Sequence, residues 1–170
     1  MLRRSSAYVN CSAGNMTNST YEHGVRFSWS WFGVPVLKGP GVTDGIAVRW
    51  QSFNKDLVAI SASIASTSTK IRYGSKDVFK TPTKNNLDRA VSLTFSMQGP
   101  SGSTSFAESG YIDLYVSTNN KVAIEKTTFR FHYGHADVEF NNLTFSYPLG
   151  ISVTINGGYK LTEKDWVIGG

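Results

Sequence analysis

The alternation of apolar and polar residues across Tyr111–Tyr133 is the feature that most constrains how this chain can fold. Ile112, Leu114 and Val116 alternate with more polar neighbours. A period of two belongs to a strand with one face turned inward and the other turned to water, whereas a helix spaces its apolar residues three and four apart. The stretch therefore predicts β-structure at the centre of the fold.

A hairpin is predicted within this stretch, because the alternation stops at Thr118–Asn120 and resumes at Ile124. A two-residue turn would place Leu114 opposite Glu125. A three-residue loop, with its last asparagine in the left-handed conformation that this residue tolerates, places Leu114 opposite Ile124. We expect the second register, because residues opposite each other in a hairpin share one face. The apolar phase then moves from even to odd positions, so a bulge or bend is expected after Glu125.

Other segments show the same alternation and predict further strands. They are Val25–Trp31, Ile46–Trp50, Val58–Ile64, Val91–Met97, Leu143–Tyr147, Ile151–Ile155 and the run from Tyr159 toward Trp166. Residues 57–65 also fit helical spacing, but the serines and threonines that follow have low helix propensity. About eight to ten antiparallel strands are therefore expected in an all-β sandwich, with a jelly roll favoured and an immunoglobulin-like sandwich as the alternative.

One domain is expected for the 170 residues, since no proline-rich or Gly/Ser-only linker divides them. Residues 1–22 lack periodicity and are expected to be a flexible N-terminal arm, with residues 23–170 as a single β-sandwich domain. The opening residues contain no apolar core of a secretion signal, and no apolar run is long enough for a transmembrane segment. Cys11 is the only cysteine, so an intrachain disulfide is impossible and an unreactive thiol is expected.

The composition favours a location outside the cytosol. Charged residues make up 17% of the chain, below the average of about 25% for soluble domains. Serine, threonine, glycine and aromatic residues are abundant instead, which is typical of virion, extracellular and cell-surface β-proteins. The net charge of +5 favours anionic partners such as nucleic acid, acidic glycans or lipid headgroups.

The segment from residue 66 to 89 holds the densest charge of the chain. Because it contains Gly74 and Pro82, we expect a loop with at most a short strand near residues 70–73. Its basic residues, interleaved with Tyr73 and Phe79, are a candidate footprint for phosphates or sulfated glycan, and a solvated loop is the other interpretation. The candidate residues are Lys70, Arg72, Lys76, Lys80, Lys84 and Arg89.

Tyr111 and Tyr115 are further candidates for ligand binding, because their neighbours on the same strand face are polar and their rings should be partly exposed. Tyrosine offers a large contact area with little rotamer entropy to lose, although it is also common in ordinary strands. Trp29, Trp31 and Trp50 could form a platform for sugar rings. Because the first two share their face with other apolar residues, packing in the core is expected instead.

Four residues near the end of the central stretch could ligate a metal: His132, His135, Asp137 and Glu139. Their spacing matches no ligand signature, so surface histidines are expected, and neither a metal nor another cofactor. No nucleophile elbow, phosphate-binding loop or dinucleotide fingerprint is present in the sequence. An enzyme is therefore the least favoured class.

Two functional hypotheses follow from these features. The first is a non-enzymatic structural subunit of a virion or surface assembly, of the capsid, spike or fibre type, whose sheet edges are covered by self-association. The alternative is a secreted or surface module of the lectin or adhesin type. Such a module would bind glycan or polyanion through the two tyrosines and the basic segment.

Overall fold

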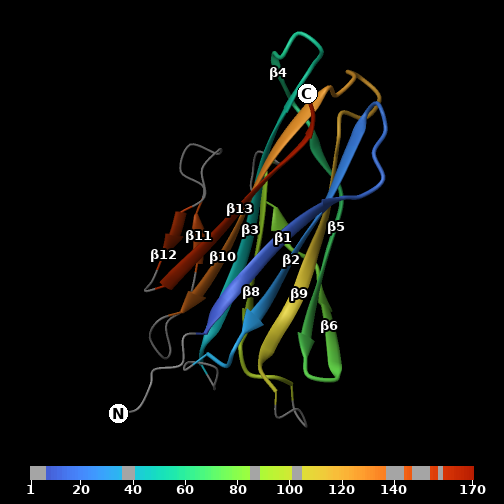
Figure 1. The fold of residues 1–170 in the computed structure, drawn as a ribbon. Coiled ribbons are helices and arrows are strands. Elements are labelled where there is room, and N and C mark those ends of the chain that lie inside the picture. Colours follow the sequence, from blue (N-terminus) through green and yellow to red (C-terminus); the bar gives the residue numbers. More distant parts are fainter. Residues whose placement is uncertain are drawn as a thin grey trace.

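Two antiparallel β-sheets pack face to face in this protein (Figure 1). The computed structural model describes residues 7–35, 41–84, 89–100, 105–136, 144–146, 154–156 and 159–170. Their regular structure is entirely β, so the described part of the chain contains no helix that could cross a membrane. The all-β antiparallel sandwich expected from the alternation is confirmed.

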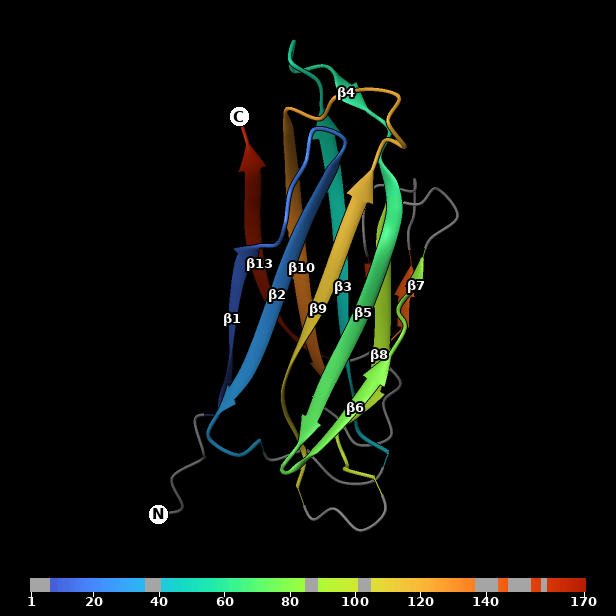
Figure 2. The ribbon, with the colours of Figure 1, turned by 90° about the vertical axis from the view of Figure 1, so that its right-hand side faces the viewer.

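Each sheet combines strands from both halves of the chain. Sheet A has the order β1 (Tyr8–Asn15), β2 (Glu22–Phe32), β9 (Ala107–Ser117), β5 (Ser63–Tyr73) and β6 (Lys76–Lys80). Sheet B has the order β13 (Tyr159–Gly169), β10 (Lys126–Ala136), β3 (Thr43–Phe53), β8 (Ala90–Ser96) and β7 (Thr83–Lys84), with β4 (Ala59–Ile60) paired to β3. A separate hairpin consists of β11 (Thr144–Ser146) and β12 (Thr154–Asn156). Figure 2 shows sheet A in front, with sheet B behind it.

The strand order is that of an immunoglobulin-like sandwich, which the sequence left as the alternative to a jelly roll. In chain order, the strands β1, β2, β3, β5, β9, β10 and β13 take the places A to G of that fold. Their order is A-B-E-D in sheet A and G-F-C in sheet B. The strands β6, β7 and β8 follow D in the sequence and extend the two sheets on the same side of the sandwich (Figure 2).

The predicted hairpin that pairs Leu114 with Ile124 is wrong, because β9 and β10 lie in different sheets. Leu114 lies opposite Val25 of β2 and Thr67 of β5 instead. Ile124 is buried in the connection that crosses from one sheet to the other. The change of apolar phase after Glu125 therefore marks a change of sheet and not a bulge. Alternation cannot distinguish these cases, because both sheets turn their apolar faces to one core.

Residues 8–15, expected to belong to a flexible arm, form β1 and pair with β2 along their whole length. The side chains that they turn inward are Val9, Cys11 and Ala13, which pack against the core. Only Val9 among them is a strong strand former, while Cys11 and Ala13 are small, so the alternating pattern is faint. Pairing with β2 and contact with the core hold β1 in place.

The loop expected between residues 66 and 89 is also replaced by strands over most of its described part. The strands β5 and β6 form a hairpin that turns at Gly74, whose φ of 65° lies in the left-handed region that glycine tolerates. The strand β5 was obscured in the sequence because its inward-facing positions include polar residues such as the buried Thr69.

Aromatic rings dominate the core between the sheets. The ring centroids of Phe95 and Tyr133 each lie 5.7 Å from that of Trp29. Trp29 and Trp50 are only 2% and 6% exposed, so the expectation that they pack in the core is confirmed. Trp31 is half-buried and donates a hydrogen bond from its indole N–H to the hydroxyl of Tyr133.

Candidate ligand-binding surfaces

The outer face of sheet A carries both tyrosines that were predicted to bind a ligand. In β9, Ile112, Leu114 and Val116 are fully buried in the core. Because side chains alternate along a strand, Tyr111 and Tyr115 project from the opposite face. Both are half-buried, so the partial exposure expected of their rings is observed.

A row of four side chains, here called the aromatic–cation row, crosses this face: Phe79 on β6, Lys70 on β5, Tyr111 on β9 and Arg26 on β2. Lys70 lies opposite both Phe79 and Tyr111 in the strand register. The guanidinium carbon of Arg26 lies 3.8 Å from the Tyr111 ring centroid, and the Lys70 ammonium lies 5.1 Å from it. Phe79 is 68% exposed. The row thus alternates rings with cations that are attracted to the ring faces.

Both tyrosine rings pack against well-ordered neighbours. Tyr111 lies under the guanidinium group of Arg26. Arg26 is itself held by Asp113, because it donates from Nε and Nη2 to the two carboxylate oxygens at 2.7 and 2.8 Å. Hydrogen bonding to this carboxylate raises the pKa of Arg26. Tyr115 packs over Gly24, where an added Cβ atom would lie closer than 3.0 Å to the ring. A ligand would therefore meet a surface that needs little ordering.

Carboxylates balance the basic residues of this face. The ammonium of Lys70 lies 3.9 Å from Asp77, and the guanidinium of Arg72 lies 4.0 Å from Asp77 and 3.9 Å from Glu108. Exposed ion pairs contribute only about 0–1 kcal/mol each, so a ligand could displace them at small cost. Because carboxylates lie near these basic side chains, the outer face of sheet A has no large excess of positive charge.

The structure brings only some of the predicted site residues together. Tyr111, Tyr115, Lys70 and Arg72 share the outer face of sheet A. The other four are distributed over an edge and a second sheet: Lys76 and Lys80 on β6, Lys84 on β7, and Arg89 immediately before β8. The basic segment is consequently not one continuous footprint. Sequence reasoning missed Arg26 and Asp113 as members of the face, although their positions in the alternation of β2 and β9 indicate that they point outward.

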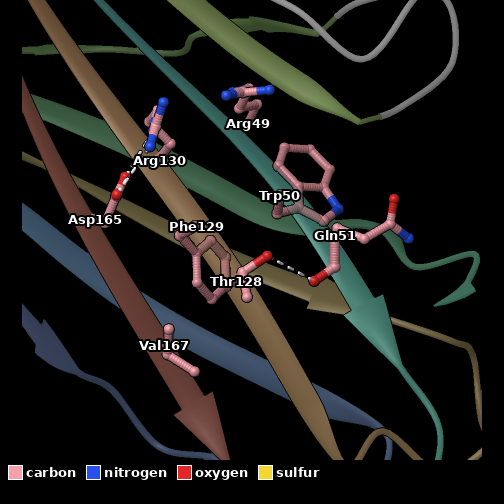
Figure 3. A pocket seen from close by; sticks show the side chains of 8 residues that line it. All are labelled: Arg49, Trp50, Gln51, Thr128, Phe129, Arg130, Asp165 and Val167. Atoms are coloured by element: carbon pink, nitrogen blue, oxygen red, sulfur yellow. Dashed lines mark hydrogen bonds and ion pairs between the residues drawn. The ribbon is translucent and has the colours of Figure 1, made fainter. Parts of the chain in front are cut away.

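A pocket of about 350 Å³ opens on the outer face of sheet B (Figure 3). It is lined by Arg49, Trp50, Gln51, Thr128, Phe129, Arg130, Asp165 and Val167. Arg49 of β3 and Asp165 of β13 lie opposite Arg130 of β10, one on each side. Arg130 donates from Nε and Nη2 to the carboxylate of Asp165 at 2.7 and 2.9 Å. This pocket, here called the arginine pocket, was not predicted, because only the pairing of distant strands assembles it.

The two arginines of the arginine pocket act on the ionisable groups near them. Hydrogen bonding to Arg130 lowers the pKa of Asp165, and the charges of Arg130 and Arg49 lower it further. His132 lies two residues after Arg130 on β10, on the same face of the strand. Burial is the main cause of its lowered pKa. The charges of the same two arginines add to this effect, while Glu163, whose carboxylate lies 3.2 Å from Nδ1 of His132, opposes it.

The two histidines near the end of the central stretch are buried, whereas the sequence predicts them at the surface: His132 is 6% exposed and His135 is 8% exposed. They occupy opposite phases of β10. His132 pairs with Glu163, whereas Nδ1 of His135 is hydrogen-bonded to the buried carboxylate of Asp44, which also accepts from the hydroxyl of Tyr133. Asp137 and Glu139, the other two candidates, lie outside the described residues. No group of three potential metal ligands occurs within the described ranges.

Cys11 has the properties of an unreactive thiol. It is half-buried on the inner side of β1, and burial raises its pKa to about 11. The thiolate, which is the nucleophilic form, is therefore scarce at neutral pH.

No protein-family model matches the chain, and no curated protein matches it. Among solved structures, the collagen-binding domain from a Staphylococcus aureus adhesin aligns with a TM-score of 0.41 and 11% identity, covering 90% of this chain and 95% of that one. A second structure, AvmM, is described as catalysing macrocyclization in alchivemycin A biosynthesis. It aligns with a TM-score of 0.40 and 12% identity, covering 95% of this chain and 89% of that one. At these values neither similarity carries an argument about function.

Proposed function

We propose that this protein is a non-enzymatic, adhesin-like module of a cell surface or the extracellular space that binds carbohydrate on the outer face of sheet A. The observation that carries this proposal is the aromatic–cation row, in which the exposed Phe79 and the half-buried Tyr111 stand among rigid polar groups. Aromatic rings bury the apolar faces of sugars, and neighbouring polar groups then hydrogen-bond the hydroxyls. Tyrosine supplies both functions in one side chain.

The charge balance favours carbohydrate over a polyanion as the ligand. A polyanion binds chiefly by displacing counterions from an unbalanced basic surface. On this face Arg26 is paired with Asp113 in a bidentate arrangement, and Lys70 and Arg72 lie near Asp77. Carboxylate and guanidinium groups arranged side by side offer both acceptors and donors, which is the pattern that sugar hydroxyls require.

The structural-subunit hypothesis gains no support from the fold or the comparisons, and self-association remains a prediction. The strand β6 is the outermost strand of sheet A, and such an edge can pair with another chain. However, β6 carries Lys76 and Lys80, which are exposed. Charged residues, lysine above all, are a common means of preventing edge-to-edge pairing.

Glycan-array binding followed by titration of the best glycan would test the proposal. Tyr111→Ala and Phe79→Ala should each weaken binding at least about tenfold, or ~1.4 kcal/mol, because each removes a stacking surface. Phe32→Ala is a matched control: Phe32 is also an exposed aromatic, at 61%, but it stacks on Tyr8 away from the row. The control should bind like the wild type. Absence of glycan binding, or equal losses in all three variants, would contradict the proposal.

Salt dependence would separate carbohydrate from polyanion as the ligand class. Engagement of four basic charges by a polyanion gives a slope of log affinity against log salt of roughly −3 to −4. For carbohydrate we expect a slope near zero, because few counterions are released. A steep slope that flattens when Lys76, Lys80 and Lys84 are replaced by serine would favour a polyanion on the basic segment instead.

A further inference from the structure

We propose that the arginine pocket binds a compact oxyanion, a carboxylate or sulfate group carried by a small polar molecule, through Arg49 and Arg130. The pocket lies on sheet B, on the opposite side of the sandwich from the aromatic–cation row (Figures 1 and 3). This site is therefore independent of the proposed carbohydrate face and would remain if that proposal failed.

The arrangement of the charges is the first argument. Arg49 and Arg130 are direct cross-strand neighbours between β3 and β10. Like charges in directly opposite positions destabilise a sheet, and a bound anion between them converts that repulsion into attraction. Asp165 is the one carboxylate among the described lining residues, and both of its oxygens are engaged by Arg130. The lining thus combines two guanidinium groups with a single acidic group.

The positioning of Arg130 is the second argument. Its bidentate pairing with Asp165 fixes the plane of the guanidinium group, so little side-chain entropy remains to be lost on binding. In Figure 3, Arg49 and Arg130 lie on neighbouring strands at the same end of the pocket. Two such planar groups can donate several hydrogen bonds to one carboxylate or sulfate.

The rest of the lining suits a small polar ligand. Gln51 and Thr128 contribute an amide and a hydroxyl to the wall. The Thr128 hydroxyl donates to the carbonyl of Gln51 at 3.4 Å, a long hydrogen bond that can be exchanged for one to a ligand. Val167, together with parts of Trp50 and Phe129, adds apolar surface. A volume of about 350 Å³ is at the lower end of the range for small-molecule sites, so the acidic group and one attached ring would fit.

The two arginines also act on His132, which neighbours the arginine pocket on β10. The charges of Arg49 and Arg130 both disfavour protonation of His132, although the charge of Glu163 has a larger effect in the opposite direction and burial is the main cause of the lowered pKa. An anion in the arginine pocket would offset the positive charge of the two arginines.

The outer face of sheet A has the same kind of bidentate pair, Arg26 with Asp113. There, however, Arg26 lies opposite Asp113 on one side and Gly14 on the other, with no second arginine.

Amide chemical-shift titrations of the isotope-labelled protein would test the pocket. The probes are inorganic sulfate and glucuronate, with glucose as the neutral comparator and chloride used to keep the ionic strength constant. We expect saturable shifts of the amides of residues 49–51, 128–130 and 165–167. Saturation by sulfate alone would identify a sulfate site, and by glucuronate alone a carboxylate site. Shifts that do not saturate, or that glucose reproduces, would overturn the proposal.

Variants would assign the binding to the two arginines. Arg49→Gln should weaken the affinity for the effective probe at least tenfold, whereas Arg26→Gln, which removes the corresponding arginine from sheet A, should leave it unchanged. Arg49→Lys retains the charge but loses the planar donor fork, so an intermediate affinity is expected. Melting temperatures establish that each variant is folded. Wild-type affinity in folded Arg49→Gln and Arg49→Lys would overturn the assignment.

Discussion

At the scale of single residues, Gly110 determines how closely the ring of Trp29 can pack in the core. This glycine lies on β9 directly opposite Trp29 of β2 and Ile71 of β5. A Cβ atom added there would lie closer than 3.0 Å to the Trp29 ring and to the backbone oxygen of Lys70. The absence of a side chain therefore makes room for the indole, which in turn contacts rings from sheet B.

Gly110→Ala should destabilise the protein by about 3 kcal/mol, because neither the backbone of Lys70 nor the buried indole can move away freely. Urea denaturation would measure the change in the free energy of unfolding. Gly14→Ala on β1 is the matched control: nothing lies within 4 Å of an added Cβ there, so a change within about 0.5 kcal/mol is expected. Equal effects of the two substitutions would show that close packing at Gly110 is unimportant.

At the scale of elements, β1 is an integral strand that also joins the two sheets along one side of the sandwich. Its backbone pairs with β2 in sheet A. From its last residue, the side-chain oxygen of Asn15 accepts a hydrogen bond from the indole N–H of Trp166 on β13, at 2.7 Å. Because β13 is the outermost strand of sheet B, this bond connects the facing edges of both sheets.

A double-mutant cycle with Asn15→Ala and Trp166→Phe should give a coupling of about 1 kcal/mol, the usual value for one hydrogen bond. Unfolding free energies of the wild type, the two single variants and the double variant supply the cycle. Asn10→Ala serves as the control for Asn15→Ala, since Asn10 is an exposed residue of the same strand that pairs with Ser30. Its effect should add to that of Trp166→Phe. Additivity in both cycles would mean that the Asn15–Trp166 contact is not formed in solution.

At the scale of the whole molecule, buried polar groups connect the sheets across the core. Nδ1 of His23 on β2 is hydrogen-bonded to the hydroxyl of Thr127 on β10 at 2.9 Å, and that hydroxyl is bonded to the hydroxyl of Ser52 on β3 at 2.9 Å. Burial is the main cause of the lowered pKa of His23. The histidine is therefore held in its neutral form where sheet A meets sheet B.

Stability should fall as the pH is lowered from neutral through the histidine range. The folded pKa values of His23 and His132 lie below the ordinary histidine value of about 6.5, so the unfolded chain binds protons first. The stability that the two neutral histidines contribute is complete above the ordinary histidine pKa and is lost as the pH falls toward their folded pKa values. Melting temperatures between about pH 7.5 and pH 5.5 would show this, because carboxylates with ordinary pKa values stay ionised there. The double variant His23→Gln, His132→Gln should show a flatter profile, and an unchanged profile would contradict the interpretation.

The sequence by itself determined which residues face inward and which face outward. Side-chain alternation is a local property of a strand, so Ile112, Leu114 and Val116 could be assigned to the core without knowing their neighbours. The outward direction of Tyr111 and Tyr115 follows from the same pattern. The all-β fold class followed for the same reason, because a period of two excludes an amphipathic helix.

Only the tertiary structure decided which strands are neighbours. The inward face of β9 and that of β10 meet one common core, so the apolar pattern is the same whether they pair with each other or lie in opposite sheets. That choice depends on how side chains from distant strands fit together, as Trp29 fits over Gly110. The two binding surfaces depend on it directly. Arg26 reaches Tyr111 because β2 pairs with β9, and Arg49 meets Arg130 because β3 pairs with β10. Strand pairing is a non-local property, and no local pattern contains it.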